Sequence, residues 1–265
     1  MATIEFRNVT RIFRQSEQNI VALQDVNLQV QDQEFVAIVG PSGCGKTTCL
    51  RMAAGLEKPS SGQVLVDGQE VRGPGTDRAV VFQQFALFPW KTVWENIEFG
   101  LISLKVPVNE RNKRIEQYIS LMGLEGYEGA YPHQLSGGMQ QRVAIARAYV
   151  LDPKVLLMDE PFGALDAQTR VVMQEELVRL ARSHPRTVLF ITHAVDEAVY
   201  LADRVVVMSR RPGKIREIID IKPIRDKESW NNLAQIEDVM DQSSFVHLRT
   251  HIWKLLREEQ GAEAH

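Results

Sequence analysis

The chain has 265 residues, of which 44% are hydrophobic and 25% charged, and its formal net charge is −3. This length gives one large domain or two modest ones with a buried core, and the composition excludes a disordered chain, a collagen and a disulfide scaffold. The charge gives no basic excess for nucleic acid, and no run of 18 or more apolar residues could span a membrane. The N-terminus has no apolar signal core, and Cys44 and Cys49 suit a reduced cytosolic protein, so we expect a chain that is not exported.

The first 30 residues alternate apolar and polar side chains over 3–13 and 21–30, which predicts half-exposed antiparallel strands. Farther along, short β-branched apolar runs alternate with helical patterns. The runs predict buried strands at 34–39, 79–82, 155–158, 187–191 and 204–208, and the patterns predict helices at 46–55, 110–122, 137–151, 167–183 and 194–202. This alternation predicts an α/β fold with a mainly parallel sheet that is covered on both faces.

The region of roughly 85–150 is mostly helical, and we expect a helical subdomain inserted into the α/β core. The tail from about residue 212 later shows a helical pattern with apolar residues at Phe245, Leu248, Ile252, Leu255 and Leu256. We therefore expect one domain over 1–211 and a C-terminal extension over 212–265, which is too short for a second sizeable core.

The strongest chemical signal is the motif Gly40-Pro41-Ser42-Gly43-Cys44-Gly45-Lys46-Thr47-Thr48, between a predicted strand and a predicted helix. Its glycines let backbone N–H groups turn toward phosphate oxygens, and the helix N-terminus adds partial positive charge. Lys46 would contact the β- and γ-phosphates of a nucleotide, and Thr47 would offer its hydroxyl to Mg²⁺. The alternative is a glycine-rich turn that binds nothing, and the flanking strand and helix argue against it.

Two carboxylates, Asp159 and Glu160, end the apolar run that begins at Val155. Parallel α/β sheets bind ligands at the carboxyl ends of their strands. Asp159 would hold Mg²⁺ directly or through water, and Glu160 would polarise the attacking water as a general base. For this segment alone, two acids at a strand-to-turn junction would be the simpler interpretation; the phosphate-binding motif favours the functional one.

A second candidate anion site is the segment Leu135-Ser136-Gly137-Gly138-Met139-Gln140-Gln141-Arg142, which begins a strongly helical run. Ser136 is a good N-cap, and the uncapped N–H groups and small residues after it suit an anion. One nucleotide needs only one such helix, so we predict a dimer in which the second site of each chain closes on the nucleotide of the other. The alternative is an ordinary capped helix.

Together these three elements resemble the ATPase subunit of an ATP-binding cassette (ABC) transporter, and the resemblance covers nearly the whole chain. The phosphate-binding motif is shared by many nucleotide hydrolases, whereas Leu-Ser-Gly-Gly followed by Gln-Gln-Arg is specific to this family. The resemblance implies that ATP and Mg²⁺ are the cofactors and that ATP hydrolysis drives transport.

The resemblance also assigns roles to isolated residues. Gln83 resembles the glutamine that reaches Mg²⁺ and the attacking water, Asp166 belongs to the loop that crosses the dimer interface, and His193 resembles the histidine that contacts the γ-phosphate. Phe13 occupies the place of the aromatic residue, often Tyr, that stacks on adenine; Met139 replaces a commoner Gln, with little expected consequence. Without the family, Gln83 would be a polar strand end, His193 a structural histidine and Phe13 a core residue.

A narrower resemblance, to the nitrate/sulfonate/taurine importer branch, rests on the segments 73–83, 87–90, 160–166 and 211–215. It implies uptake of a small anion or polar organic solute, with two transmembrane permease subunits and a periplasmic or lipid-anchored binding protein. The ATPase would be a homodimer, or pair with a closely related subunit, at the cytoplasmic face of the inner membrane. The apolar segment 85–90 would receive a cytoplasmic helix of a permease subunit; packing inside the helical subdomain is the alternative.

Other classes of protein stay open. An exporter or lipid-trafficking ATPase would have different partners, and a non-hydrolysing module would not need Lys46, Glu160 and His193. An ABC ATPase of DNA maintenance would need a long coiled coil between Lys46 and Ser136, for which the chain has no room. His247 and His251 have the i, i+4 spacing of metal ligands, but we expect a solvated helix face there.

Overall fold

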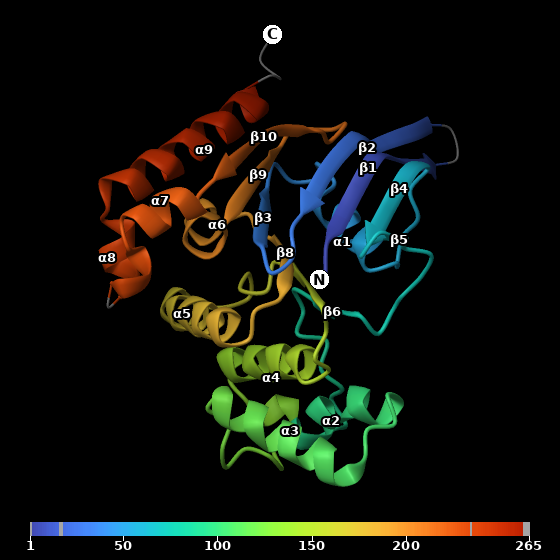
Figure 1. Ribbon diagram of the computed structural model, residues 1–265, viewed down its shortest axis with the longest axis vertical. Helices are drawn as coiled ribbons and strands as arrows, with labels where there is room; N and C mark the ends of the chain where they lie inside the picture. Colours follow the sequence, from blue (N-terminus) through green and yellow to red (C-terminus); the bar gives the residue numbers. More distant parts are fainter. Residues whose placement is uncertain (1, 16–17, 234, 262–265) are drawn as a thin grey trace. The chain divides into compact units, whose positions relative to one another are not determined.

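The computed structural model describes residues 2–15, 18–233 and 235–261. Its contacts divide the chain into two compact units (Figure 1). The first unit contains Met1–Gly75 and Pro185–His265, and the second contains Thr76–His184. The functional division expected from the sequence, with an insertion over 85–150 and an extension over 212–265, stays a prediction.

An antiparallel sheet of four strands lies in the first unit, in the order β2-β1-β4-β5. Its strands are β1 (Ile4–Gln15), β2 (Gln18–Val30), β4 (Ser61–Val66) and β5 (Gln69–Glu70). The predicted N-terminal antiparallel strands are therefore confirmed. The hairpin of β4 and β5 was not predicted, although its Asp67-Gly68 turn has φ values of 51° and 72°, which a tight hairpin turn favours.

The first unit also contains the parallel strands β3 (Phe35–Val39), β8 (Thr187–Ile191) and β9 (Arg204–Met208). Strand β3 pairs with β8 on one side and with β9 on the other, and all five residues of both β3 and β8 are buried. Strand β10 (Ile215–Asp220) runs antiparallel to β9. The sequence did not predict β10 because its side chains are mostly half-buried or exposed.

Helices cover these strands. Helix α1 (Lys46–Ala53) packs against β4 and β8, α6 (Val195–Leu201) packs against β3 and β9, and α9 (Ser243–Gly261) packs against α6 and β9 (Figure 1). The unit is completed by the short helices α7 (Lys222–Lys227), η2 (Trp230–Asn232) and α8 (Ile236–Met240). The predicted tail helix is confirmed as α9: Phe245, Ile252, Leu255 and Leu256 are buried and Leu248 is half-buried.

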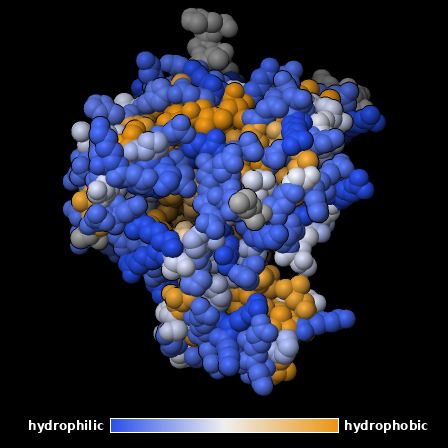
Figure 2. All heavy atoms as spheres, viewed as in Figure 1, coloured by the Kyte–Doolittle hydropathy of each residue, from blue (hydrophilic) through white to orange (hydrophobic). Residues whose placement is uncertain are grey.

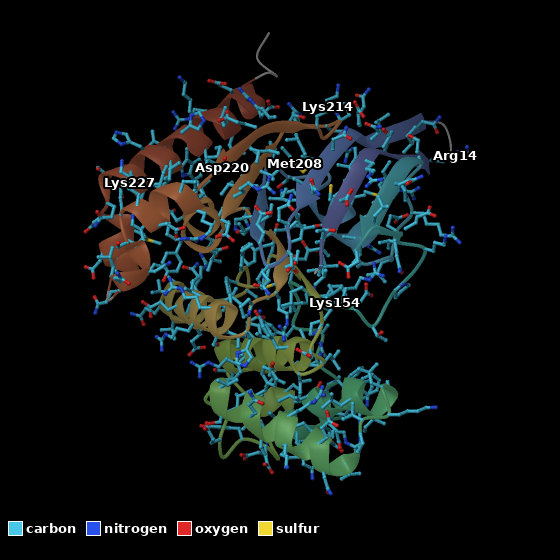
Figure 3. The ribbon with its side chains drawn as sticks, in the orientation of Figure 1. Arg14, Lys154, Met208, Lys214, Asp220 and Lys227 are labelled. Carbon is cyan, nitrogen blue, oxygen red and sulfur yellow. The ribbon has the colours of Figure 1, made fainter. Side chains whose placement is uncertain are left out.

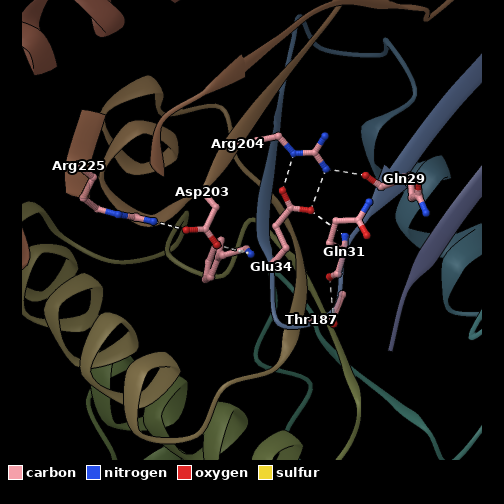
Figure 4. Close-up of polar contacts among 8 residues, drawn as sticks. Gln29, Gln31, Glu34, Thr187, Asp203, Arg204 and Arg225 are labelled. Carbon is pink, nitrogen blue, oxygen red and sulfur yellow. Dashed lines mark hydrogen bonds and ion pairs between the residues drawn. The ribbon is translucent and has the colours of Figure 1, made fainter. Parts of the chain in front are cut away.

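Polar contacts join the amino ends of the parallel strands (Figure 4). Arg204, which begins β9, donates to Glu34 before β3 at 2.8 Å and to the carbonyl of Gln29 at 2.6 Å. The hydroxyl of Thr187, which begins β8, accepts from the backbone of Gln33 at 2.9 Å. The hydrogen bond from Arg204 to Glu34 raises the pKa of the arginine. Charged groups therefore stabilise the edge of the sheet opposite the carboxyl ends of β3 and β8.

The second unit consists of two parallel strands and a helical region. Strand β6 (Arg78–Val81) pairs with β7 (Val155–Asp159). The helices are α2 (Val93–Ser103), α3 (Val108–Leu121), η1 (Pro132–Gln134), α4 (Gly137–Tyr149) and α5 (Ala167–Ser183). Helix α4 packs against α2, α3, α5 and β6 and so forms the centre of this unit. The predicted α/β fold with parallel strands and helical region is confirmed.

Candidate nucleotide-binding site

The phosphate-binding motif forms a loop between β3 and α1. Gly43 and Gly45 have φ values of 74° and 100°, which side chains rarely adopt, and Gly45 is the N-cap of α1. A Cβ on Gly45 would lie 2.5 Å from the side chain of Leu23, so glycine is also required there sterically. The loop thus has the conformation that lets backbone N–H groups turn toward an anion.

Lys46 holds this loop together from inside. Its side chain is buried, and its ammonium donates to the carbonyl oxygens of Gly40 at 2.8 Å and Pro41 at 3.1 Å. The charge is therefore fixed inside the loop, where it can act on a phosphate group. The adjacent Thr47 is exposed and Thr48 is half-buried at the start of α1.

Both cysteines are buried free thiols. Burial raises the pKa of Cys44, against the opposing effect of Lys46, and raises the pKa of Cys49 to about 12. These thiols are protonated near neutral pH, so they act as small apolar side chains, Cys44 in the loop and Cys49 in α1.

His193 is exposed and lies two residues after the end of β8, one residue before the N-cap of α6. Because β8 is the parallel neighbour of β3, His193 and the phosphate-binding loop both leave the sheet at carboxyl ends of adjacent strands. The turn is fixed by the buried Thr192, whose hydroxyl donates to Glu197 at 2.5 Å and accepts from the backbone of Ala194 at 3.0 Å. The sequence analysis missed Thr192 and Glu197.

Phe13 lies half-buried in β1. The guanidinium of Arg11 lies 4.5 Å from the centroid of its ring, in the range of a cation–π contact. Phe13 is therefore not a fully buried core side chain, and the guanidinium of Arg11 covers one face of its ring.

In the second unit, Gln83 and Glu160 are brought together although they are 77 residues apart. They follow the adjacent parallel strands β6 and β7, and the amide nitrogen of Gln83 donates to the carboxylate of Glu160 at 3.2 Å. Glu160 has a φ of 46°, a left-handed conformation that costs an L-residue about 1–2 kcal/mol. Asp159, the last residue of β7, is half-buried beside it. Strain of this kind concentrates at functional sites.

The start of α4 has the predicted cap: Ser136 is the N-cap, and its hydroxyl accepts from the backbone of Met139 at 3.3 Å. Gly138 is buried, and a Cβ there would lie 2.6 Å from the methyl group of Thr169 in α5. Glycine is thus required for the packing of α4 on α5. Ser136 and Gly137 are exposed, and a cavity of about 450 Å³ lies beside this helix start.

Asp166 is the N-cap of α5, and its carboxylate accepts from the backbone of Thr169 at 3.0 Å. That hydrogen bond lowers the pKa of Asp166. The side chain is exposed, so the cap fixes the residue without hiding it from a partner.

The apolar segment 85–90 is fixed by two polar residues that sequence analysis missed. The fully buried amide of Asn96 bonds to the backbone of Phe88 in both directions, at 2.9 and 3.2 Å. Arg147 in α4 donates to the carbonyls of Phe85 at 3.2 Å and Ala86 at 2.8 Å, and desolvation by burial lowers its pKa. No local signal in the sequence indicates these contacts, because Arg147 lies 61 residues from Ala86.

The exposed side of this segment is apolar. Trp90 is 71% exposed, and the ring of Phe88 contacts the rings of Trp90 and Phe99, with centroids 5.8 and 4.6 Å apart. Phe99 and Ile102 on α2 are 44% and 50% exposed, and Figure 2 shows apolar surface over the part of the second unit that contains α2.

The tail histidines have no metal-site geometry. His251 contacts the carboxylate of Glu217 at 2.7 Å, an acidic neighbour that the sequence did not indicate. Across the described residues, no group of three or more His, Cys, Asp and Glu side chains could hold a metal ion.

Comparison with known proteins identifies the family. The ABC transporter family profile matches residues 23–163. The chain is 55% identical to an uncharacterized ABC transporter ATP-binding protein of Methanocaldococcus jannaschii over 97% of this chain and 92% of that protein. It is 45% identical to the nitrate import ATP-binding protein NrtD of Synechocystis sp. (98% of this chain, 97% of that protein), and 40% identical to the aliphatic sulfonates import ATP-binding protein SsuB of Bacillus thuringiensis (94% of each).

Solved structures of ATP-binding cassette proteins also match this chain. A dimeric ATP-binding cassette in a post-hydrolysis state with ADP and phosphate matches with a TM-score of 0.73 and 35% identity, over 82% of this chain and 98% of that one. The protein cbiO1 of Clostridium perfringens, part of an ABC transporter complex, matches with a TM-score of 0.74 and 28% identity, over 86% of this chain and 92% of that one.

The chain belongs to the ABC transporter family, as an ATP-binding subunit whose ATP hydrolysis is coupled to transport. The predicted similarity to the nitrate and sulfonate branch is confirmed as well. In the part of the chain that the structure describes, no helix has both the length and the apolar character needed to cross a membrane.

Proposed function

We propose that the chain is the ATP-hydrolysing subunit of an importer for a small anion, such as nitrate, a sulfonate or taurine, or for a related polar solute. It would work as a dimer at the cytoplasmic face of the inner membrane, with two permease subunits and a substrate-binding protein. The names of two relatives, a nitrate importer subunit at 45% identity and a sulfonate importer subunit at 40%, support import and the anionic class of substrate.

Nucleotide binding is assigned to the loop Gly40–Thr48. Its glycine conformations and the fixed ammonium of Lys46 suit the phosphates, and the half-buried ring of Phe13 would stack on adenine. His193, at the carboxyl end of the strand next to this loop, would contact the γ-phosphate.

Hydrolysis is assigned to Glu160 as the general base. The main structural support is the 3.2 Å contact between the Gln83 amide and the Glu160 carboxylate, because it orients a carboxylate that must accept a proton from water. Glu160 would hold that proton, and Gln83 would keep the carboxylate in place.

Mg²⁺ is the proposed metal ion, with Thr47, Gln83 and Asp159 as ligands. A hydroxyl, an amide carbonyl and a carboxylate are the hard oxygen donors that Mg²⁺ prefers. The amide nitrogen of Gln83 donates to Glu160, so its carbonyl oxygen is the atom that would face the ion. When bound, Mg²⁺ would neutralise charge on the phosphates during hydrolysis.

The dimer is assigned to the start of α4 and to Asp166. Ser136, Gly137 and Gly138 would complete the nucleotide site of the partner chain, since exposed N–H groups at a capped helix start suit an anion. The similar cassette with ADP and phosphate is dimeric, which supports this assignment.

Contact with the permease is assigned to the surface of Phe88, Trp90, Phe99 and Ile102. A rigid backbone under an exposed aromatic surface is typical of an interface. Because the segment follows Gln83 in the chain, movement at the nucleotide site would reach the permease through it.

The test is ATP hydrolysis by the complex reconstituted in proteoliposomes with its permease subunits and binding protein. Nitrate, taurine and an aliphatic sulfonate are added in turn, and a complex with Glu160→Gln measures the background. We expect one of these solutes to stimulate hydrolysis only when the binding protein is present. Stimulation by solute without any binding protein would favour an exporter and contradict the proposal.

A further inference from the structure

Hydrogen bonds hold the turn between β9 and β10, residues 209–214, against the rest of the first unit. The backbone N–H of Gly213 donates to Ala22 at 2.9 Å, and its carbonyl accepts from Gln24 at 3.0 Å, which joins the turn to β2. The hydroxyl of Ser209 accepts from the backbone of Lys214 at 3.0 Å and closes the turn. Figure 3 labels Met208, the last residue of β9, and Lys214, the last residue of the turn.

The C-terminal helix holds the same turn. The carboxylate of Glu259 in α9 accepts from the backbone N–H of Arg210 at 2.8 Å and from the guanidinium of Arg216 at 2.7 Å. The turn is therefore fixed from two sides, by β2 and by α9.

This turn packs directly on the phosphate-binding loop. A Cβ on Gly213 would lie 1.8 Å from the carbonyl oxygen of Cys44, and a Cβ on Gly40 would lie 3.1 Å from the carbonyl of Met208. No side chain fits between the two segments at Gly213, so the turn and the loop have a fixed separation.

Arg211 lies at the tip of this turn, over the loop. Its Nη2 atom is 3.5 Å from the position of a Cβ on Gly43 and, apart from Gly43 and its two chain neighbours, is the one described heavy atom within 4 Å of that point. Arg211 is exposed and makes no hydrogen bond or ion pair with any residue that the structure describes. Two nearby arginines do have a partner: the backbone N–H of Arg210 and the guanidinium of Arg216 both donate to Glu259.

We propose that Arg211 is a second cationic phosphate-binding residue of the nucleotide site, presented to the loop from outside while Lys46 acts from inside. The inference rests on the proposed assignment of nucleotide binding to the loop. A guanidinium has five N–H donors in a planar fork that matches a phosphate group, and those of Arg211 are not used within the described part of the chain. Arg211 is not part of the glycine-rich motif, because the turn 209–214 lies far from the loop in the sequence.

The test measures the dissociation constants of ATP, ADP and adenosine for the isolated full chain with Mg²⁺. The variants are Arg211→Gln, Arg211→Lys and Lys214→Gln, with Lys46→Ala as the reference for the loop. Lys214→Gln is the matched control, since it removes one positive charge from the same turn at an exposed position.

We expect Arg211→Gln to weaken ATP and ADP about tenfold, the loss of one charge-assisted contact. Arg211→Lys should recover part of that affinity because it keeps the charge and loses the fork. Lys214→Gln should stay within about twofold, and adenosine, which has no phosphate, should bind all Arg211 variants alike.

Two results would overturn the inference. One is wild-type ATP affinity in Arg211→Gln while Lys46→Ala binds poorly, which leaves the loop as the site and removes Arg211 from it. The other is weaker adenosine binding and a lower melting temperature in both Arg211 variants, which makes Arg211 a structural brace. If Lys46→Ala itself binds ATP normally, the assignment of the loop fails instead, and the two failures are distinguishable.

Discussion

Glu160 is held in a left-handed conformation and contacts Gln83 at 3.2 Å. Glu160→Gln keeps the shape of the side chain and removes its capacity to accept a proton. We expect the maximal hydrolysis rate to fall about 10²–10⁴-fold while ATP affinity is kept. Steady-state hydrolysis and equilibrium binding measure the two quantities. Near-normal turnover would remove Glu160 from its role, and Glu116→Gln, at an exposed position of α3, is the control.

Cys49 gives a pH prediction. Burial raises its pKa to about 12, and the thiolate is the reactive form. We expect maleimide to label the native chain far more slowly than the urea-unfolded chain at pH 7. Above pH 9, labelling of the unfolded chain should level off, whereas labelling of the native chain should keep rising. Equal rates in the two states, measured by mass spectrometry, would contradict the buried position.

The raised pKa of Cys49 also makes the free energy of unfolding depend on pH. Because the folded chain holds the proton of Cys49 more tightly than the unfolded chain does, unfolding releases protons once the unfolded thiol titrates. The free energy of unfolding therefore falls as the pH rises above about 9, and this group has no effect near neutral pH.

At the scale of single residues, sequence motifs predicted the glycines of the loop and the cap Ser136. These features depend on neighbours within a few positions. Asp166 was predicted as an interface residue, and its capping of α5 was not predicted.

The contacts of Asn96 and Arg147 were missed because both side chains bond to the backbone of the segment 85–90, 8 and 61 residues away, and no local pattern signals such bonds. The position of Arg211 next to Gly43 was missed because the two residues lie far apart in the chain.

The substitution Trp90→Ala tests whether the segment 85–90 contacts the permease subunits. The side chain is 71% exposed, and its backbone neighbourhood is fixed by Asn96 and Arg147. Trp90→Ala should therefore leave the melting temperature and the basal ATPase unchanged and weaken assembly with the permease subunits. Co-purification and coupled transport measure that loss, and Trp253→Ala, at a 48% exposed site on α9, is the control.

The variant Phe88→Ala alone cannot test the permease interface. Its ring lies 4.6 Å from Phe99 and 5.5 Å from the guanidinium of Arg147, so Phe88→Ala removes internal packing as well as surface. If Trp90→Ala assembles normally and Phe88→Ala only unfolds the chain, the segment is part of the local core and the interface assignment is wrong.

Among the elements, the parallel strands and the helices α4 and α5 were predicted to within about two residues, since buried strands are continuous apolar runs and these helices have caps. Strands β4, β5 and β10 were missed. Strands β5 and β10 lie at sheet edges, and β4 lies between β1 and β5. All three have exposed residues, so hydrogen bonds to neighbouring strands define them more than their own pattern does.

At the scale of the whole molecule, the dimer prediction is tested by mixing two defective chains. Ser136→Arg damages the start of α4 and leaves the loop intact, whereas Lys46→Ala does the reverse. If the start of α4 acts on the partner's nucleotide, the mixed dimer has one undamaged composite site. We expect each variant alone to be nearly inactive and the mixture to regain part of the ATPase activity.

The mixing ratio provides the control. Activity should peak near equal amounts of the two chains, and Ser136→Arg alone should still bind ATP as a monomer. A mixture that stays inactive, although native mass spectrometry shows the mixed dimer, would mean that both elements act within one chain.

Interactions at the amino ends and at the carboxyl ends of the parallel strands in the first unit should depend differently on ionic strength. At the amino edge, the Arg204 and Glu34 side chains are only 22% and 13% exposed, and salt screens buried pairs weakly. At the carboxyl ends, the negative charge of ATP approaches the loop through solvent, where the Debye length falls from about 10 Å at 0.1 M salt to about 3 Å at 1 M. Raising potassium chloride over this range should weaken ATP binding several-fold while the melting temperature of the nucleotide-free chain changes little. A fluorescence titration and a thermal melt in the same buffers would separate the two responses, and the salt chosen for an assay would then set how much ATP the protein holds.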